Sequence, residues 1–235
     1  FDEVLSFGEI EDELEKPLKA WQFSHNVMEM ATAVKPFVFE QLLSRDDCES
    51  VTFIDPDAYV FNPLSDMFAA LNEWSIILTP HMYEPAANDL EAREFGPAMH
   101  GVFNLGFLSV RKDANANKFV GWWKKRLQNY CVIERERGFF TDQKWINFVP
   151  AFFEGVLIFC HPGYNVATWN TFQRYVERDQ EGQFWVDGEP LVFYHFAGIY
   201  SGRHDEVTRQ YSNNPEVLIR LQEWYLSLIS PEDAD

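Results

Sequence analysis

The sequence is poor in the features that mark disulfide-bonded and membrane-spanning proteins. Among its 235 residues it has 3 cysteines, Cys48, Cys131 and Cys160, an odd number without metal-like spacing. This predicts reduced thiols in a cytosolic protein and no disulfide framework. No apolar run approaches the roughly 18 residues of a membrane-spanning helix. We therefore expect a cytoplasmic protein without a transmembrane segment, and peripheral attachment to a membrane stays open.

Positive charge is also scarce, since 19 Lys and Arg stand against 37 Asp and Glu, for a formal net charge of −18. A chain this acidic repels a nucleic-acid backbone or an anionic surface unless a local basic patch intervenes, and the sequence shows no such patch. We therefore expect no nucleic-acid partner. If the chain handles a phosphate-bearing substrate, a bound cation is needed to offset the repulsion.

Apolar residues, by contrast, are abundant. Hydrophobic residues make up 46% of the chain and aromatic residues 17%, which is enough to bury a full core and argues against disorder. Without an internal repeat, a low-complexity stretch or a clear linker, we expect a single domain over residues 1–235.

The apolar pattern predicts strands that alternate with helices. The expected helices cover residues 36–44, 63–71, 114–130, 141–148 and 215–228, and the expected strands cover 50–54, 74–79, 103–110, 156–159, 184–186 and 191–194. Asp187-Gly188 predicts a hairpin between the last two strands. This alternation favours an α/β fold with a mostly parallel mixed sheet flanked by helices, where ligands bind beyond the carboxyl ends of strands.

Two carboxylates stand just past the strand over residues 50–54. Asp55 and Asp57 are separated by Pro56 and can turn toward one point, and clustered oxygens are the ligands that hard divalent cations prefer. Because Asp and Pro are also common turn residues, a plain strand-to-turn connection is the alternative.

Three further segments carry polar residues at positions where a ligand site is possible: on a strand, at the start of a helix and after a strand. Asn104 and Gly106 lie on a predicted strand, where a glycine allows close approach of the backbone or a bend. Asp142 and Gln143 open a predicted helix, where capping is the simpler explanation. His195 follows an apolar strand, and a structural role is the alternative there too.

The order of these motifs is a buried strand ending in Asp-x-Asp, an Asn-x-Gly strand, a helix opening with Asp-Gln, and a late His-x-x-Gly. This order resembles the retaining GT-A glycosyltransferases, in particular the family 8 type, over roughly residues 32–198. The resemblance extends to a bacterial group in which these segments recur: Ala33-Val34-Lys35-Pro36, Phe53-Ile54-Asp55-Pro56-Asp57, Leu78-Thr79-Pro80-His81, Asp142-Gln143-Lys144-Trp145 and Pro162-Gly163-Tyr164-Asn165-Val166-Ala167.

The resemblance implies a GT-A type, Rossmann-like fold and a metal-dependent hexosyltransferase. Asp55, Asp57 and His195 would bind Mn²⁺ or Mg²⁺, which would bridge the diphosphate of a nucleotide-sugar donor, with a UDP-sugar favoured. Gln143 would lie near the reacting sugar carbon and Asp142 would accept hydrogen bonds from sugar hydroxyls. Retention of stereochemistry is implied in the same way. The acceptor would be a glycan, a lipid or a protein.

The resemblance also implies a set of donor-binding residues: Lys35, Asn104, Gly106, Gly198 and Arg203. Family 8 enzymes continue the histidine motif into Lys-Pro-Trp, whereas Ile199-Tyr200-Ser201-Gly202-Arg203 follows here, so Arg203 is the candidate to replace the phosphate-binding lysine. The family's first strand and helix, which hold the nucleobase, are expected to lie before Phe1 and to be missing from this sequence.

Two other functions are open to the same residues. A phosphohydrolase could use Asp55 as nucleophile and Asp57 as acid, but that pattern requires a threonine where this sequence has Tyr59. A noncatalytic carbohydrate-binding or scaffold protein could keep the fold without the activity.

Overall fold

The computed structural model describes residues 3–201 and 204–229, and the chain divides into two compact units. Unit 1 comprises residues 1–53, 66–80 and 94–159, and unit 2 comprises residues 54–65, 81–93 and 160–235. The expectation that residues 1–235 form a single domain stays a prediction.

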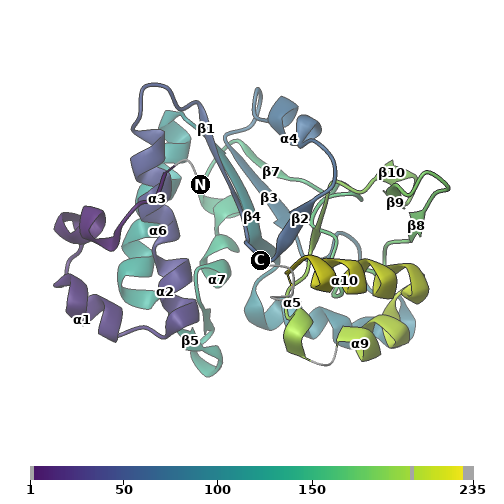
Figure 1. The fold of residues 1–235 in the computed structure, drawn as a ribbon. Coiled ribbons are helices and arrows are strands. Elements are labelled where there is room, and N and C mark those ends of the chain that lie inside the picture. Colours follow the sequence, from purple (N-terminus) through teal and green to yellow (C-terminus); the bar gives the residue numbers. More distant parts are fainter. Residues whose placement is uncertain (1–2, 202–203, 230–235) are drawn as a thin grey trace, which may run out of the picture. The chain divides into compact units, whose positions relative to one another are not determined.

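Unit 1 contains a four-stranded sheet with the order β1-β4-β3-β7 (Figure 1). Its strands are β1 (Ser50–Ile54), β3 (Ile76–Pro80), β4 (Phe103–Arg111) and β7 (Val156–Ile158). β3 runs parallel to β7 and antiparallel to β4. The sheet is mixed, as predicted, although β4 departs from the mostly parallel pattern. All of β4 except Arg111 is buried, which explains its nearly continuous apolar sequence.

Helices flank this sheet, and α3 and α6 lie side by side in Figure 1. On α6, Phe119 and Trp123 are one turn apart and stack with ring centroids 5.6 Å from each other, while Phe39 of α3 meets Trp123 edge-on. The helices of this part of the chain are α1 (Leu18–Phe23), α2 (Val27–Ala33), α3 (Lys35–Leu43), α4 (Ser65–Ala70), α5 (Phe95–His100), α6 (Ala114–Tyr130), α7 (Gln143–Ile146) and α8 (Val149–Phe152). Short elements complete it: 3-10 helices at Phe7–Glu13 and Arg135–Arg137, and the pair β5 (Ile133–Glu134) and β6 (Phe139–Phe140).

Unit 2 combines two small antiparallel sheets with two helices. One sheet has the order β10-β9-β8 and the other pairs β11 with β2. The strands are β2 (Ala58–Val60), β8 (Val176–Arg178), β9 (Phe184–Val186), β10 (Glu189–Pro190) and β11 (Phe193–His195), and the helices are α9 (His204–Tyr211), α10 (Pro215–Ile229) and 3-10 turns at Asn88–Glu94 and Ile199–Ser201. α10 contributes Leu218, Leu221 and Tyr225 to a core that also contains Tyr194 and Phe196.

The structure corrects two local predictions. The predicted hairpin over 184–194 forms only in part, because β9 turns at Asp187 into the two-residue β10, while the following strand β11 pairs with β2. The helix predicted over 141–148 does not begin at Thr141, which has a φ of 45°, and Asp142 occupies the N-cap position. That helix also divides into α7 and α8, and Pro150 lies in the first turn of α8.

Other features of the chain follow the sequence. Cys48, Cys131 and Cys160 are free thiols. Within the described residues, no helix combines the length and the apolar character that crossing a membrane requires.

Asp113 begins α6 and offers a test of how unit 1 is held together. Its carboxylate accepts hydrogen bonds from the Ala116 amide at 2.8 Å, from Ser75 Oγ at 2.7 Å and from the Arg111 side chain at 3.0 Å. Since D113A removes a helix cap and leaves two donors without an acceptor, we expect it to lower the free energy of unfolding by about 2 kcal/mol, measured by urea denaturation.

The matched control is D46A, because Asp46 is an exposed turn residue. Its effect is expected to stay within about 0.5 kcal/mol. Equal losses in the two variants would contradict the assignment of Asp113 as a cap and bridging acceptor.

Candidate functional site

Three side chains predicted as metal ligands converge in unit 2. Each of Asp55, Asp57 and His195 offers one ligand atom, and these atoms all lie within 4.8 Å of one another. His195 Nε2 is 3.0 Å from Asp57 Oδ1 and 3.7 Å from Asp55 Oδ2. Two carboxylates and one imidazole thus face a common point.

The local backbone explains why the two acids converge. Asp55-Pro56-Asp57-Ala58 forms a turn closed by a hydrogen bond of 3.0 Å from the Ala58 amide to the Asp55 carbonyl. Proline suits the second position of such a turn because its φ is already fixed near the required value. The turn therefore holds Asp55 and Asp57 on either side of Pro56.

Strand pairing brings the histidine to this turn. β2 and β11 pair with Ala58 opposite His195, and the Phe196 amide donates to the Asp57 carbonyl at 2.8 Å. Directly opposed residues of an antiparallel pair lie about 5 Å apart at their Cα atoms. The register of one short ladder therefore sets the distance between His195 and Asp57.

Burial differs among the three groups. The His195 side chain is 4% exposed, whereas those of Asp55 and Asp57 are 29% and 44% exposed. The imidazole is therefore enclosed by protein, whereas both carboxylates can be reached from solvent. The cluster thus offers two carboxylate oxygens and one imidazole nitrogen to a ligand.

Aromatic rings fix the imidazole and the strand that carries it. Trp169 meets the His195 ring edge-to-face at 5.1 Å between centroids. Phe196 stacks on Tyr225 of α10 at 3.8 Å with an angle of 1° between the rings. Burial raises the pKa of Tyr225, and the negative charge of Asp57 adds to the shift. Sequence reasoning did not pair Trp169 with His195 or Tyr225 with Phe196, because each lies far along the chain from its partner.

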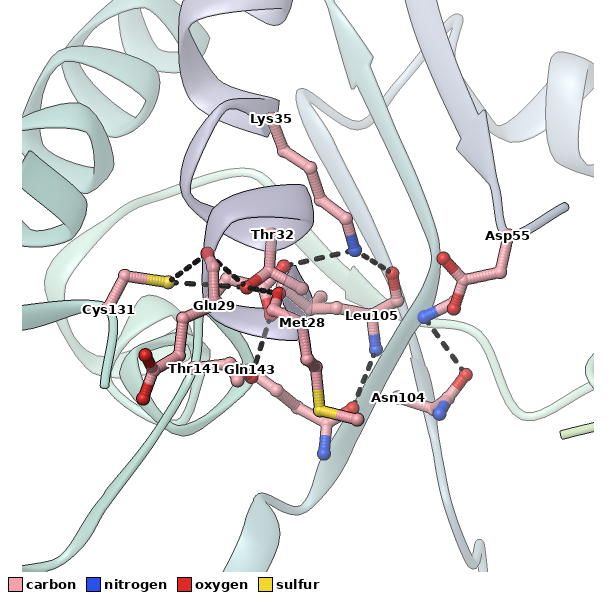
Figure 2. A network of polar contacts seen from close by, with 12 residues as sticks. Met28, Glu29, Thr32, Lys35, Asp55, Asn104, Leu105, Cys131, Thr141 and Gln143 are labelled. Carbon is pink, nitrogen blue, oxygen red and sulfur yellow. Dashed lines mark hydrogen bonds and ion pairs between the residues drawn. The ribbon is translucent and has the colours of Figure 1, made fainter. Parts of the chain in front are cut away.

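Unit 1 contains a second polar cluster, around Lys35. Its ammonium donates to the Leu105 carbonyl at 3.0 Å and lies 3.1 Å from Asp142 Oδ2, and Figure 2 shows the side chain reaching from its helix toward Leu105. Lys35 is 7% exposed and Asp142 is 2% exposed. The ammonium also lies over the Phe53 ring at 4.2 Å. This is a buried ion pair with further support from the backbone and an aromatic face.

The amide of Gln143 is engaged at both ends within the same unit. Its Oε1 accepts from the Leu105 amide at 3.1 Å (Figure 2). Its Nε2 donates to the His100 carbonyl at 3.2 Å. Gly101, with a φ of 134°, lies so close that an added Cβ would be 3.0 Å from Gln143 Cγ. The sequence predicted a close backbone approach in this segment, and Gly101 is where it occurs.

The remaining predicted donor residues lie at separate places. The Asn104 side chain accepts from the Gly106 amide at 3.1 Å, so these two residues of β4 are bonded to each other in unit 1. Gly198 lies in unit 2 with a φ of 71°, in the left-handed region that glycine adopts without strain. Arg203 lies outside the described residues.

The residues of the unit 2 cluster fit a divalent cation. Carboxylate oxygens suit Mg²⁺ and Mn²⁺, and imidazole is accepted by transition metals such as Mn²⁺. The two carboxylates carry a formal charge that a dication balances. The cluster could therefore hold such an ion.

No protein-family model matches the chain. Two uncharacterized proteins of Bacillus subtilis (strain 168) are similar to it in sequence. YfnD is 30% identical over 192 residues, which cover 80% of this chain and 59% of YfnD. YfnF is 28% identical over 190 residues, which cover 80% of this chain and 62% of YfnF. The chain thus spans about three fifths of the length of these relatives.

One solved structure is also similar, that of a glycosyltransferase involved in the glycosylation of the major capsid of PBCV-1. The match has a TM-score of 0.47 and 12% sequence identity and covers 78% of each chain. A likeness of this size carries no conclusion about activity.

We expect the chain to bind one Mn²⁺ ion at the unit 2 cluster. Electron paramagnetic resonance of free Mn²⁺ would show D57N and H195A each weakening the affinity by at least about tenfold, because D57N removes the charge of one ligand and H195A removes the ligand nitrogen. Mn²⁺ should also raise the unfolding midpoint of the parent chain.

The control for this measurement is E189Q, since Glu189 is an exposed acid of unit 2 outside the cluster. It should bind Mn²⁺ as the parent does. Unchanged binding in both D57N and H195A would contradict the assignment of the ligands.

The pair of Lys35 and Asp142 makes a separate prediction. K35M leaves the buried Asp142 carboxylate without its cation, so we expect the free energy of unfolding to fall by roughly 3–5 kcal/mol. The double variant K35M/D142N should recover part of this loss, giving a coupling above about 0.5 kcal/mol in a double-mutant cycle.

K118M serves as the control, because Lys118 lies on the exposed face of α6. Its effect should stay within about 0.5 kcal/mol. A K35M chain as stable as its parent would show that this lysine does not support unit 1.

Proposed function

We propose that the chain is the catalytic part of a metal-dependent glycosyltransferase, which moves a hexose from a nucleotide-diphosphate donor to an acceptor with retention. The observation that carries the proposal is the meeting of Asp55, Asp57 and His195. These residues come from two segments far apart in the sequence, and the motif order that resembles the GT-A family requires that they meet.

The chemistry of this cluster supports group transfer from a diphosphate. When bound, Mn²⁺ or Mg²⁺ supplies positive charge that stabilises the departing nucleoside diphosphate. Asp55 and Asp57 hold the ion through charge, and His195 adds a nitrogen ligand whose position is fixed by its strand. With the two carboxylates balanced in this way, an anionic donor can approach despite the net charge of −18.

The proposal extends to the residues that the resemblance assigns to the donor. Gln143 and Asp142 would contact the transferred sugar, and Lys35, Asn104, Gly106, Gly198 and Arg203 would bind the donor, for which a UDP-sugar is favoured. The internal bonds of Gln143 and the ion pair of Asp142 would hold these side chains in defined positions, as a site on a rigid support requires.

The alternative is a noncatalytic carbohydrate-binding or scaffold protein with the same fold. It needs no cation and no cleavage of a donor. Activity toward nucleotide sugars therefore separates the two functions.

The test is release of nucleoside diphosphate from a panel of UDP-glucose, UDP-galactose, UDP-N-acetylglucosamine and GDP-mannose, with and without Mn²⁺. We expect Mn²⁺-dependent release from at least one donor, and a fall of about hundredfold or more in D57N, since the charge stabilisation of the leaving group is lost. E189Q should retain the parent rate. An inactive parent chain that binds Mn²⁺ normally would favour the scaffold.

A further inference from the structure

Unit 2 also contains a pocket of about 620 Å³ that the proposed chemistry does not use. This volume lies within the range of about 300–1,000 Å³ that is usual for small-molecule sites. The residues of its lining that carry the argument are Tyr59, Phe61, Arg178, Phe184, Arg220 and Trp224. Tyr59 lies on β2 and Phe61 directly after it, and the others come from β8, β9 and α10.

Aromatic rings form one wall of the pocket. The Tyr59 ring meets Trp224 edge-on at 4.9 Å, Phe61 lies 5.5 Å from Trp224, and Phe184 lies 5.6 Å from Phe61. Trp224 remains 36% exposed and Tyr59 37% exposed. Aromatic side chains left open to solvent in a concave site offer flat apolar faces with polar tips. A sugar ring matches this surface, because its C–H groups form an apolar face and its hydroxyls surround the edge.

Guanidinium groups provide positive charge beside the rings. Arg178 lies 5.4 Å from the Phe184 ring centroid and donates to the Gly182 carbonyl at 3.1 Å. Arg220 is exposed, and within the described part of the chain no hydrogen bond or ion pair engages it. In a protein of net charge −18, an arginine left unpaired in a pocket points to an anionic ligand.

The one acid of the lining, Asp179, offsets only one of the two guanidinium charges of Arg178 and Arg220. Asp179 accepts hydrogen bonds of 2.7 Å from Trp185 Nε1 and from the Gln183 amide. The bond from Trp185 is the main reason that the pKa of Asp179 is lowered. Asp179 therefore stays ionised, and the two arginines of the lining outweigh its single negative charge.

The pocket begins next to the candidate cation site. Tyr59 follows Asp57 by two residues, a separation of about 7 Å along an extended strand. α10 connects the two places as well, because Trp224 precedes Tyr225, whose pKa responds to the charge of Asp57. A saccharide in the pocket would therefore lie within one or two sugar units of the cation ligands.

We propose that this pocket binds the acceptor, and that the acceptor is a saccharide carrying a carboxylate or phosphate group. The assignment rests on the proposed transferase function, which supplies the need for an acceptor beside the cation. Tyr59 and Trp224 pack against the sugar ring, and Arg220 pairs with the anionic group.

The test measures binding to the whole chain by isothermal titration calorimetry, without donor. The probes are trigalacturonate, glucose 6-phosphate and the neutral maltotriose, at concentrations up to about 10 mM, which detects millimolar affinity. We expect at least one anionic probe to bind more tightly than maltotriose. R220Q should lower that affinity to the level of the neutral sugar, and W224A should weaken binding by about tenfold or more.

Two control variants match these changes. Arg209 is an exposed arginine of α9 and Tyr175 an exposed aromatic residue, and both lie outside the pocket lining. R209Q and Y175A should bind the probes as the parent does. Unfolding midpoints of all four variants show whether any loss of binding reflects misfolding.

The outcomes separate this proposal from the transferase function. Binding that depends on Trp224 and Arg220, in a chain that releases nucleotide from no donor, would uphold the pocket and overturn the catalytic role. Donor cleavage by a chain that binds none of the three probes, or that binds them equally in W224A, would overturn the pocket. Binding of UDP in place of the saccharides, with the same dependence on Arg220, would overturn it too by marking a nucleotide site.

Discussion

The pairing of β2 with β11 is the interaction on which the candidate site depends. It places His195 opposite Ala58 and therefore beside Asp57. A slip of one residue would turn the histidine toward the other face of the ladder, because side chains alternate along a strand. The register is secured on the opposite side of β11, where the His195 amide donates to the Val166 carbonyl at 2.8 Å. One short strand bonded on both sides thus fixes the imidazole.

The two polar clusters of the chain differ in how their charges are satisfied. In unit 1, Lys35 and Asp142 are buried and neutralise each other at 3.1 Å. In unit 2, Asp55 and Asp57 keep substantial exposure while they face a buried imidazole. A satisfied buried pair favours a defined local structure, whereas partly exposed carboxylates that share one point are available to a ligand. This contrast is why the cation is assigned to unit 2.

Local signals in the sequence predicted much of the fold. The strand over 50–54 ends at Ile54 as expected, Asp113 caps α6, and Pro215 opens α10. In each case the residue types that decide the element lie inside it or beside it. The pairing of β-strands is harder to predict, because it depends on residues that are distant in the sequence. The hairpin predicted over 184–194 failed for this reason, since β11 pairs with β2.

The candidate site was predictable only in part. Motif order singled out Asp55, Asp57 and His195, but no local pattern shows that a strand at 193–195 returns to the turn at 55–58. The sequence did not predict the pocket, because Tyr59 and Trp224 belong to separate elements. Each also has apolar residues nearby in the sequence, as a core residue does.

Within unit 2, strand pairing and aromatic contacts hold the imidazole of the candidate site in place before a ligand binds. His195 is held by its ladder and by Trp169, and the next residue, Phe196, is stacked on Tyr225 at 3.8 Å. Asp55 and Asp57 instead project from a turn with more exposure to water. A ligand that engages this cluster meets an imidazole that is already in place, and this lowers the entropic cost of binding. Since α10 carries Tyr225 and Trp224 as consecutive residues, the same helix that supports the histidine strand also forms a wall of the pocket.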